Sequence, residues 1–144
     1  MRMREILIGG SGGSTKAVDV GMALLRVVAG AALSINHGAA KMTHPSKIID
    51  NARDLGLPAP TFFGWMAAIS ECIGGALLAL GLVTRPAAFL VACTMATAAF
   101  LAHAGAGFST REPALLFLCV ALLYLIAGSG RYGVDALLRG GRKE

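Results

Sequence analysis

Two ionisable side chains stand inside stretches of the 144-residue chain that are otherwise apolar, Arg26 in the first and Glu71 in the second. An unpaired charge at such a position in a bilayer costs roughly 3 kcal/mol or more. If the two stretches are antiparallel neighbours, both residues reach a similar depth, and we expect a buried ion pair. The pair could hold the polar head group of a ligand, or it could only fix the register of the helices. The candidates for cofactor binding are therefore Arg26, Glu71 and a nearby cation, Lys41.

A second group of ionisable residues gathers where the apolar stretches begin or end. His37 and His103 close two of them, Glu112 opens another, and Lys41 lies one turn beyond His37. Such groups can pass a proton between water and a molecule dissolved in the membrane. The alternative is that they anchor helix ends at the membrane surface. Under the first interpretation, the candidate catalytic residues are His37, His103 and Glu112.

Metal binding and thiol exchange are not expected. The three histidines, which include His44, are far apart, and no His-x3-His or His-x2-Glu spacing places two ligands on one helical face, so we predict no metal site. The cysteines lack the CxxC pair of a dithiol exchange site. We expect them to be packing residues in three different apolar stretches: Cys72, Cys93 and Cys119.

The apolar stretches predict an integral membrane protein. Hydrophobic residues make up 56% of the chain and charged residues 15%, which lies outside the range of soluble domains. Four stretches are candidates to cross the bilayer as helices: 17–37, 62–83, 86–103 and 113–128. The last is short, with Pro113 expected in its first turn and Gly128 at its end. The expected fold is all-α, a bundle of four transmembrane helices.

The links between these stretches predict topology. Short links at 84–85 and 105–112 make neighbouring spans antiparallel, whereas the link 38–61 has room for a short interfacial helix over about 45–55. Most Lys and Arg residues fall on the side of the termini, so both termini are expected to be cytoplasmic. Because the net charge of +5 comes from tails and loops rather than one basic stripe, nucleic-acid binding is not expected.

Three segments are expected along the chain. Residues 1–16 form a flexible lead-in, 17–135 a membrane domain and 136–144 a basic tail. Within the domain, small residues at four-residue spacing would allow close approach of two backbones, either between spans or in a homo-oligomer. These residues are Gly30, Ser34 and Gly38, with Gly74 and Gly75 in the second span.

Short motifs follow one another along most of the chain. They are LRV at 25–27, HGAAK at 37–41, LGLP at 55–58, ECIGG at 71–75, LGLVTR at 80–85, His103, GF at 107–108, Glu112 and GSGRYGVD at 128–135. As a set that covers about 24–135, they resemble the DoxX family of small four-span membrane proteins. The resemblance implies a four-helix membrane fold and redox work at the membrane, such as sulfur or thiosulfate oxidation that feeds quinone.

These observations together predict a redox-associated subunit of the bacterial cytoplasmic (inner) membrane that binds a quinone-like cofactor. Because the chain has no CxxC, haem histidine pair or nucleotide motif, a partner oxidoreductase is expected to supply the electron carrier. The alternative is a non-enzymatic anchor, scaffold or assembly factor. A small transporter is less favoured, since the sequence shows no internal repeat and no broken-helix pair.

Overall fold

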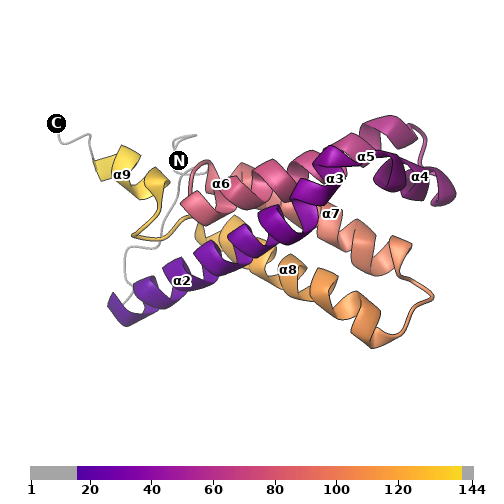
Figure 1. Ribbon diagram of the computed structural model, residues 1–144. Coiled ribbons are helices and arrows are strands. Elements are labelled where there is room, and N and C mark those ends of the chain that lie inside the picture. Colours follow the sequence, from indigo (N-terminus) through magenta and orange to yellow (C-terminus); the bar gives the residue numbers. More distant parts are fainter. Residues whose placement is uncertain (1–15, 141–144) are drawn as a thin grey trace.

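The computed structural model describes residues 16–140, and over that range the chain is helical, with no strand (Figure 1). Four helices are long and apolar enough to cross a membrane, which confirms the expected four-span, all-α fold. They are Lys16–Thr43, Pro60–Leu80, Thr84–Ala102 and Phe108–Ala127. The expected lead-in falls outside the described residues apart from Lys16, as do the last four residues of the basic tail.

Three of the four spans contain a π-helical stretch, in which one extra residue widens the turn. The first span consists of α2 (Lys16–Ala32), η1 (Leu33–Gly38) and α3 (Ala39–Thr43). The second consists of α5 (Pro60–Ile69), η2 (Ser70–Gly74) and α6 (Gly75–Leu80), and the third of α7 (Thr84–Thr97) and η3 (Ala98–Ala102). Because η1 packs against η2, the two widened turns lie side by side at the centre of the bundle.

The fourth span, α8 (Phe108–Ala127), corrects the expectation that this helix begins at Pro113. The helix starts five residues earlier, so Pro113 lies in its second turn and not in its first. A proline there removes one backbone hydrogen bond, which is tolerated near a helix end where other donors reach the free carbonyl group. The earlier start gives 20 residues, about 30 Å of helix, which is the thickness of the hydrocarbon core.

Two short helices lie outside the spans. The link between the first two spans forms α4 (Ser46–Asp54), so the helix expected in this link is present, and it packs along α5. After the fourth span the chain forms α9 (Val134–Gly140). The start of α2 and α9 lie at the same end of the bundle, and α4 lies at the opposite end (Figure 1). We call these the inner and the outer end after the topology that the sequence predicts.

The first and second spans are in backbone contact through small residues. A Cβ atom on Gly30 would lie 2.6 Å from the backbone nitrogen of Ala79, and one on Gly38 would lie 2.3 Å from the Cα atom of Cys72. The Ser34 hydroxyl donates a hydrogen bond to the Cys72 carbonyl oxygen at 2.7 Å. The small-residue pattern therefore serves contact between spans.

Replacing Gly38 with alanine is expected to destabilise the protein by about 1–3 kcal/mol, because the added methyl group overlaps the backbone of Cys72. The matched control is Gly21→Ala in the same span, where an added Cβ meets no atom within 4 Å. Both changes raise helix propensity equally. Denaturation in lipid–detergent bicelles measures the difference, and equal stabilities of the two variants would contradict the observed contact.

Candidate functional site

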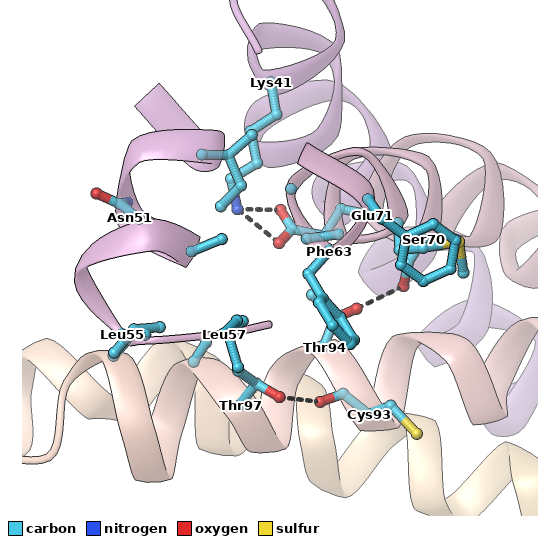
Figure 2. Close-up of a pocket in the computed structure, with 18 of the residues that line it drawn as sticks. Lys41, Asn51, Leu55, Leu57, Phe63, Ser70, Glu71, Cys93, Thr94 and Thr97 are labelled. Atoms are coloured by element: carbon cyan, nitrogen blue, oxygen red, sulfur yellow. Dashed lines mark hydrogen bonds and ion pairs between the residues drawn. The ribbon is translucent and has the colours of Figure 1, made fainter. Parts of the chain in front are cut away.

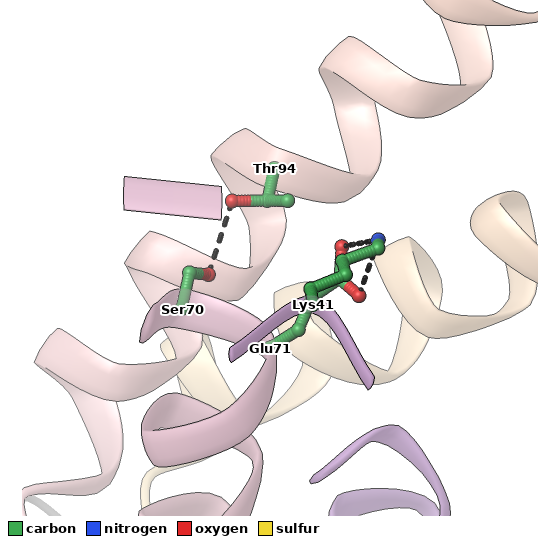
Figure 3. Close-up of polar contacts among 4 residues, drawn as sticks. All are labelled: Lys41, Ser70, Glu71 and Thr94. Atoms are coloured by element: carbon green, nitrogen blue, oxygen red, sulfur yellow. Dashed lines mark hydrogen bonds and ion pairs between the residues drawn. The ribbon is translucent and has the colours of Figure 1, made fainter. Parts of the chain in front are cut away.

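A buried ion pair joins the first two spans. Glu71, in η2, has a side chain that is only 2% exposed, and the Lys41 ammonium group in α3 lies 2.5 and 2.6 Å from its two carboxylate oxygens (Figure 3). The Lys41 side chain is 32% exposed. Its aliphatic stem reaches from the outer end of the first span towards Glu71. A carboxylate buried among apolar helices needs such a counter-charge.

The expected pair of Arg26 with Glu71 is wrong. The Arg26 guanidinium instead donates hydrogen bonds to three backbone carbonyl oxygens, of Ala79 at 3.3 Å, of Tyr132 at 3.2 Å and of Ser129. The reason is register. Since Gly30 meets Gly75 and Ala79, Arg26 lies one turn further, beside the inner end of the second span. Glu71 is eight residues from Ala79, about 12 Å along the helix.

Residues 128–135, after the fourth span, take part in a cluster of hydrogen bonds at the inner end of the bundle. We call this cluster of Arg26, Asp135 and their partners the inner lock. Besides the bonds from Arg26, it includes Asp135, whose carboxylate accepts hydrogen bonds from the Val83 and Thr84 amides at 2.8 and 2.9 Å and from the Thr84 hydroxyl at 2.7 Å. Asp135 thereby satisfies the free amides at the start of α7, where a negative charge is favourable. This cluster fixes helix ends, and Arg26 is not among the residues that line the cavity described below.

A cavity of about 510 Å³ lies between α4 and α5 on one side and α7 and η3 on the other (Figure 2). Most of its lining is apolar, as in typical small-molecule sites. Its polar residues are Lys41, Asn51, Ser70, Glu71, Thr94, Thr97 and His103. Of the six candidate residues in the sequence, the structure therefore brings Lys41, Glu71 and His103 to one cavity.

The other three candidates lie elsewhere. The His37 ring is exposed on the first span and stacks edge-on against Phe117 of α8, with 5.5 Å between ring centroids. Glu112 is exposed in the first turns of α8. Neither residue lines the cavity, and neither does Arg26. The structure therefore does not bring His37, His103 and Glu112 together in one site.

Several cavity residues were not singled out in the sequence as site residues. Thr97, whose hydroxyl donates to the Cys93 carbonyl oxygen at 3.0 Å, and Asn51, on α4, both line the cavity. The sequence pointed to Asn51 only in so far as it predicted a short helix in this link. Thr94 donates a hydrogen bond to the Ser70 hydroxyl at 3.0 Å, which joins the third span to the second (Figure 3).

The cysteines differ in their surroundings. Cys72 packs against Gly38, as expected, whereas Cys93 and Cys119 are exposed, so the expectation of packing residues is wrong for these two. Cys93 belongs to the cavity wall. Within residues 16–140, no three His, Cys, Asp or Glu side chains lie together in an arrangement that could hold a metal ion.

Four apolar helices around a central ion pair, with a cavity beside it, define a four-span integral membrane protein. The DoxX family model matches residues 21–104, and the chain belongs to this family. A Haemophilus influenzae protein named "Uncharacterized protein" is 34% identical over 122 residues, which cover 79% of this chain and 87% of the relative. The Bacillus subtilis "Putative oxidoreductase CatD" is 30% identical over 130 residues, 90% of this chain and 95% of the relative. No solved structure matches.

Proposed function

We propose that this protein is a redox-associated subunit of the bacterial cytoplasmic membrane that binds a quinone-like molecule in the cavity beside Lys41 and Glu71. The observation that carries the proposal is the cavity itself, because it is apolar except where one buried ion pair and a few hydrogen-bonding groups face it. A quinone likewise combines an apolar ring with two polar carbonyl oxygens. The name of the Bacillus subtilis relative, an oxidoreductase, supports redox work.

In this proposal, Lys41, Glu71 and His103 have separate roles in binding and protonating the quinone. Two N–H groups of the Lys41 ammonium face Glu71, and the third is left to donate a hydrogen bond to a quinone carbonyl oxygen. Glu71 holds the ammonium in place. His103, at the outer end of η3, exchanges protons with water, because an imidazole ring can both accept and donate a proton.

Reduction of a quinone to a quinol takes up two electrons and two protons. The protons enter through His103, and the electrons come from a flavin or metal centre of a partner oxidoreductase, since the sequence has no carrier motif of its own. From the charge distribution of the links we expect both termini on the cytoplasmic side, which a reporter fused after Glu144 would test.

Binding of decylubiquinone to the purified protein in lipid nanodiscs tests the proposal. We expect saturable binding, weakened at least about tenfold in Ala67→Trp, because Ala67 lines the cavity one turn from Glu71 and the indole would fill the head-group space. The matched control is Ala76→Trp, an exposed position of the same span that does not line the cavity. No binding to the native protein would favour the non-enzymatic scaffold instead.

A further inference from the structure

The outer half of the bundle consists of two arms that diverge. One arm is α4 packed along α5, and the other is α7 with η3 packed along α8. The arms are joined at η2, which contacts both α5 and α7, whereas α5 itself makes little contact with α7 or η3 over the described residues. In Figure 1 the arms separate towards the outer end, with α5 and α4 on one side and η3 on the other. The cavity occupies this space.

The first span does not close the gap between the arms. Its contacts with the second span include Gly30 and Gly38, which meet Ala79 and Cys72, and continue in α3, which contacts η2 and α5. The short helix α4 then packs along α5 in place of a full span, with Ile49 in contact with Gly64. Neither α3 nor α4 makes more than slight contact with α7 or η3 over the described residues, so these elements leave the gap between the arms open.

The composition of the cavity wall changes from inside to outside. The ion pair and the Ser70–Thr94 hydrogen bond lie at the joined end, near η2. The free edge of the α4–α5 arm carries apolar side chains of the cavity lining that are open to the surroundings: Phe62 is 59% exposed and Phe63 39% exposed. In a bilayer, such side chains face lipid tails.

The charges of the lining cancel. Lys41 and Glu71 are its only Lys, Arg, Asp or Glu residues, and they neutralise each other. An anion bound here would have to displace Glu71 from its counter-charge and would meet the carboxylate at close range, which is unfavourable at low dielectric. The cavity therefore favours a neutral head group over an inorganic anion such as thiosulfate.

We propose that the cavity takes a neutral molecule with a single polar ring and a hydrocarbon tail, which enters sideways from the bilayer between the α4–α5 arm and the α7–η3 arm. The ring reaches Lys41, and the tail lies in the opening against Phe62 and Phe63. This inference rests on the proposed function of the cavity as a quinone site. It adds the route of entry, a contribution of the tail to binding and the exclusion of anions.

The test compares two probes, decylubiquinone and the tailless 2,3-dimethoxy-5-methyl-1,4-benzoquinone, in nanodiscs. The Phe63→Ala variant is expected to bind the tailed probe about tenfold more weakly and the tailless probe less than threefold more weakly, because only the tail contacts this ring. Retained binding of the tailless probe shows that the variant is folded. The control is Phe89→Ala, an aromatic position of α7 that is 54% exposed and lies outside the cavity lining.

The outcomes separate the two proposals. Failure of both probes to bind the native protein overturns the proposed function. Binding of both probes with equal effects of Phe63→Ala, or with none, overturns the sideways entry and would fit an opening filled by a second copy of the chain. Displacement of decylubiquinone by millimolar thiosulfate would overturn the preference for a neutral ligand.

Discussion

Replacement of Lys41 with methionine is expected to lower the free energy of unfolding by about 3–5 kcal/mol, because the Glu71 carboxylate, 2% exposed, would keep its charge without a partner. Glu71→Gln is expected to cost less. Lys41 is 32% exposed, so its flexible stem can carry the freed ammonium group towards water. The double variant Lys41→Met/Glu71→Gln should recover most of the loss, since it contains no buried charge at this position.

Titration with sodium dodecyl sulfate in bicelles measures these unfolding free energies as a double-mutant cycle. The matched control is Lys47→Met, which removes an exposed lysine of α4 outside the cavity lining and should change stability by less than about 0.5 kcal/mol. If the two single changes were additive in the double variant, Lys41 and Glu71 would not interact, and the site as described would be wrong.

Replacement of Arg26 is expected to have the second large effect on the free energy of unfolding. The Arg26→Met variant removes three hydrogen bonds from a charged donor to backbone carbonyl groups, two of them in the segment after α8. At about 1.5–3 kcal/mol for each bond that involves a charged group, and with partial relaxation of the segment, we expect a loss of at least about 3 kcal/mol. Asp135→Ala, which removes three accepted hydrogen bonds at the start of α7, should act in the same direction.

Limited trypsin digestion gives these variants a local readout, because Arg131 lies within the segment that Arg26 holds and Arg139 follows it in α9. We expect cleavage at these residues to be faster in Arg26→Met than in the native protein, while the spans stay protected by the bilayer. The matched control is Arg131→Met, a change of an exposed cation in the same motif, which should leave both stability and cleavage at Arg139 unchanged. Unchanged digestion of Arg26→Met would show that the lock does not hold the segment.

Much of the fold could be predicted because a bilayer leaves the backbone few choices. A stretch that is apolar on all sides must satisfy its amides internally, so hydropathy locates the spans, and the polar link with its Pro residues locates α4. Helix ends were less accurate. The sequence favours Pro113 as a first-turn residue, whereas α8 begins five residues earlier, at Phe108.

Similar depth in the first two spans points to Arg26 as the partner of Glu71, whereas the contacts between these two helices set a register that brings Lys41 to Glu71. The small residues contain the better signal: if Gly30, Ser34 and Gly38 are placed against Gly75 and Cys72, Arg26 comes to the end of the second span. Lys41 then becomes the cation within reach of Glu71. The cavity itself could not be predicted, since it arises from the divergence of two arms and not from any local pattern.

The short helix α4 stands where a regular bundle would continue a full span. It contributes Asn51 and Ala52 to the cavity, yet the close contacts that fix the spans to one another lie elsewhere, at Gly30, Gly38 and the inner lock. The α4 wall of the cavity and these contacts are therefore encoded in separate parts of the chain, whereas Lys41 and Glu71 belong both to the cavity and to the contacts that stabilise the bundle. New side chains on α4 can change one wall of the cavity while the contacts at Gly30, Gly38 and Arg26 stay as they are.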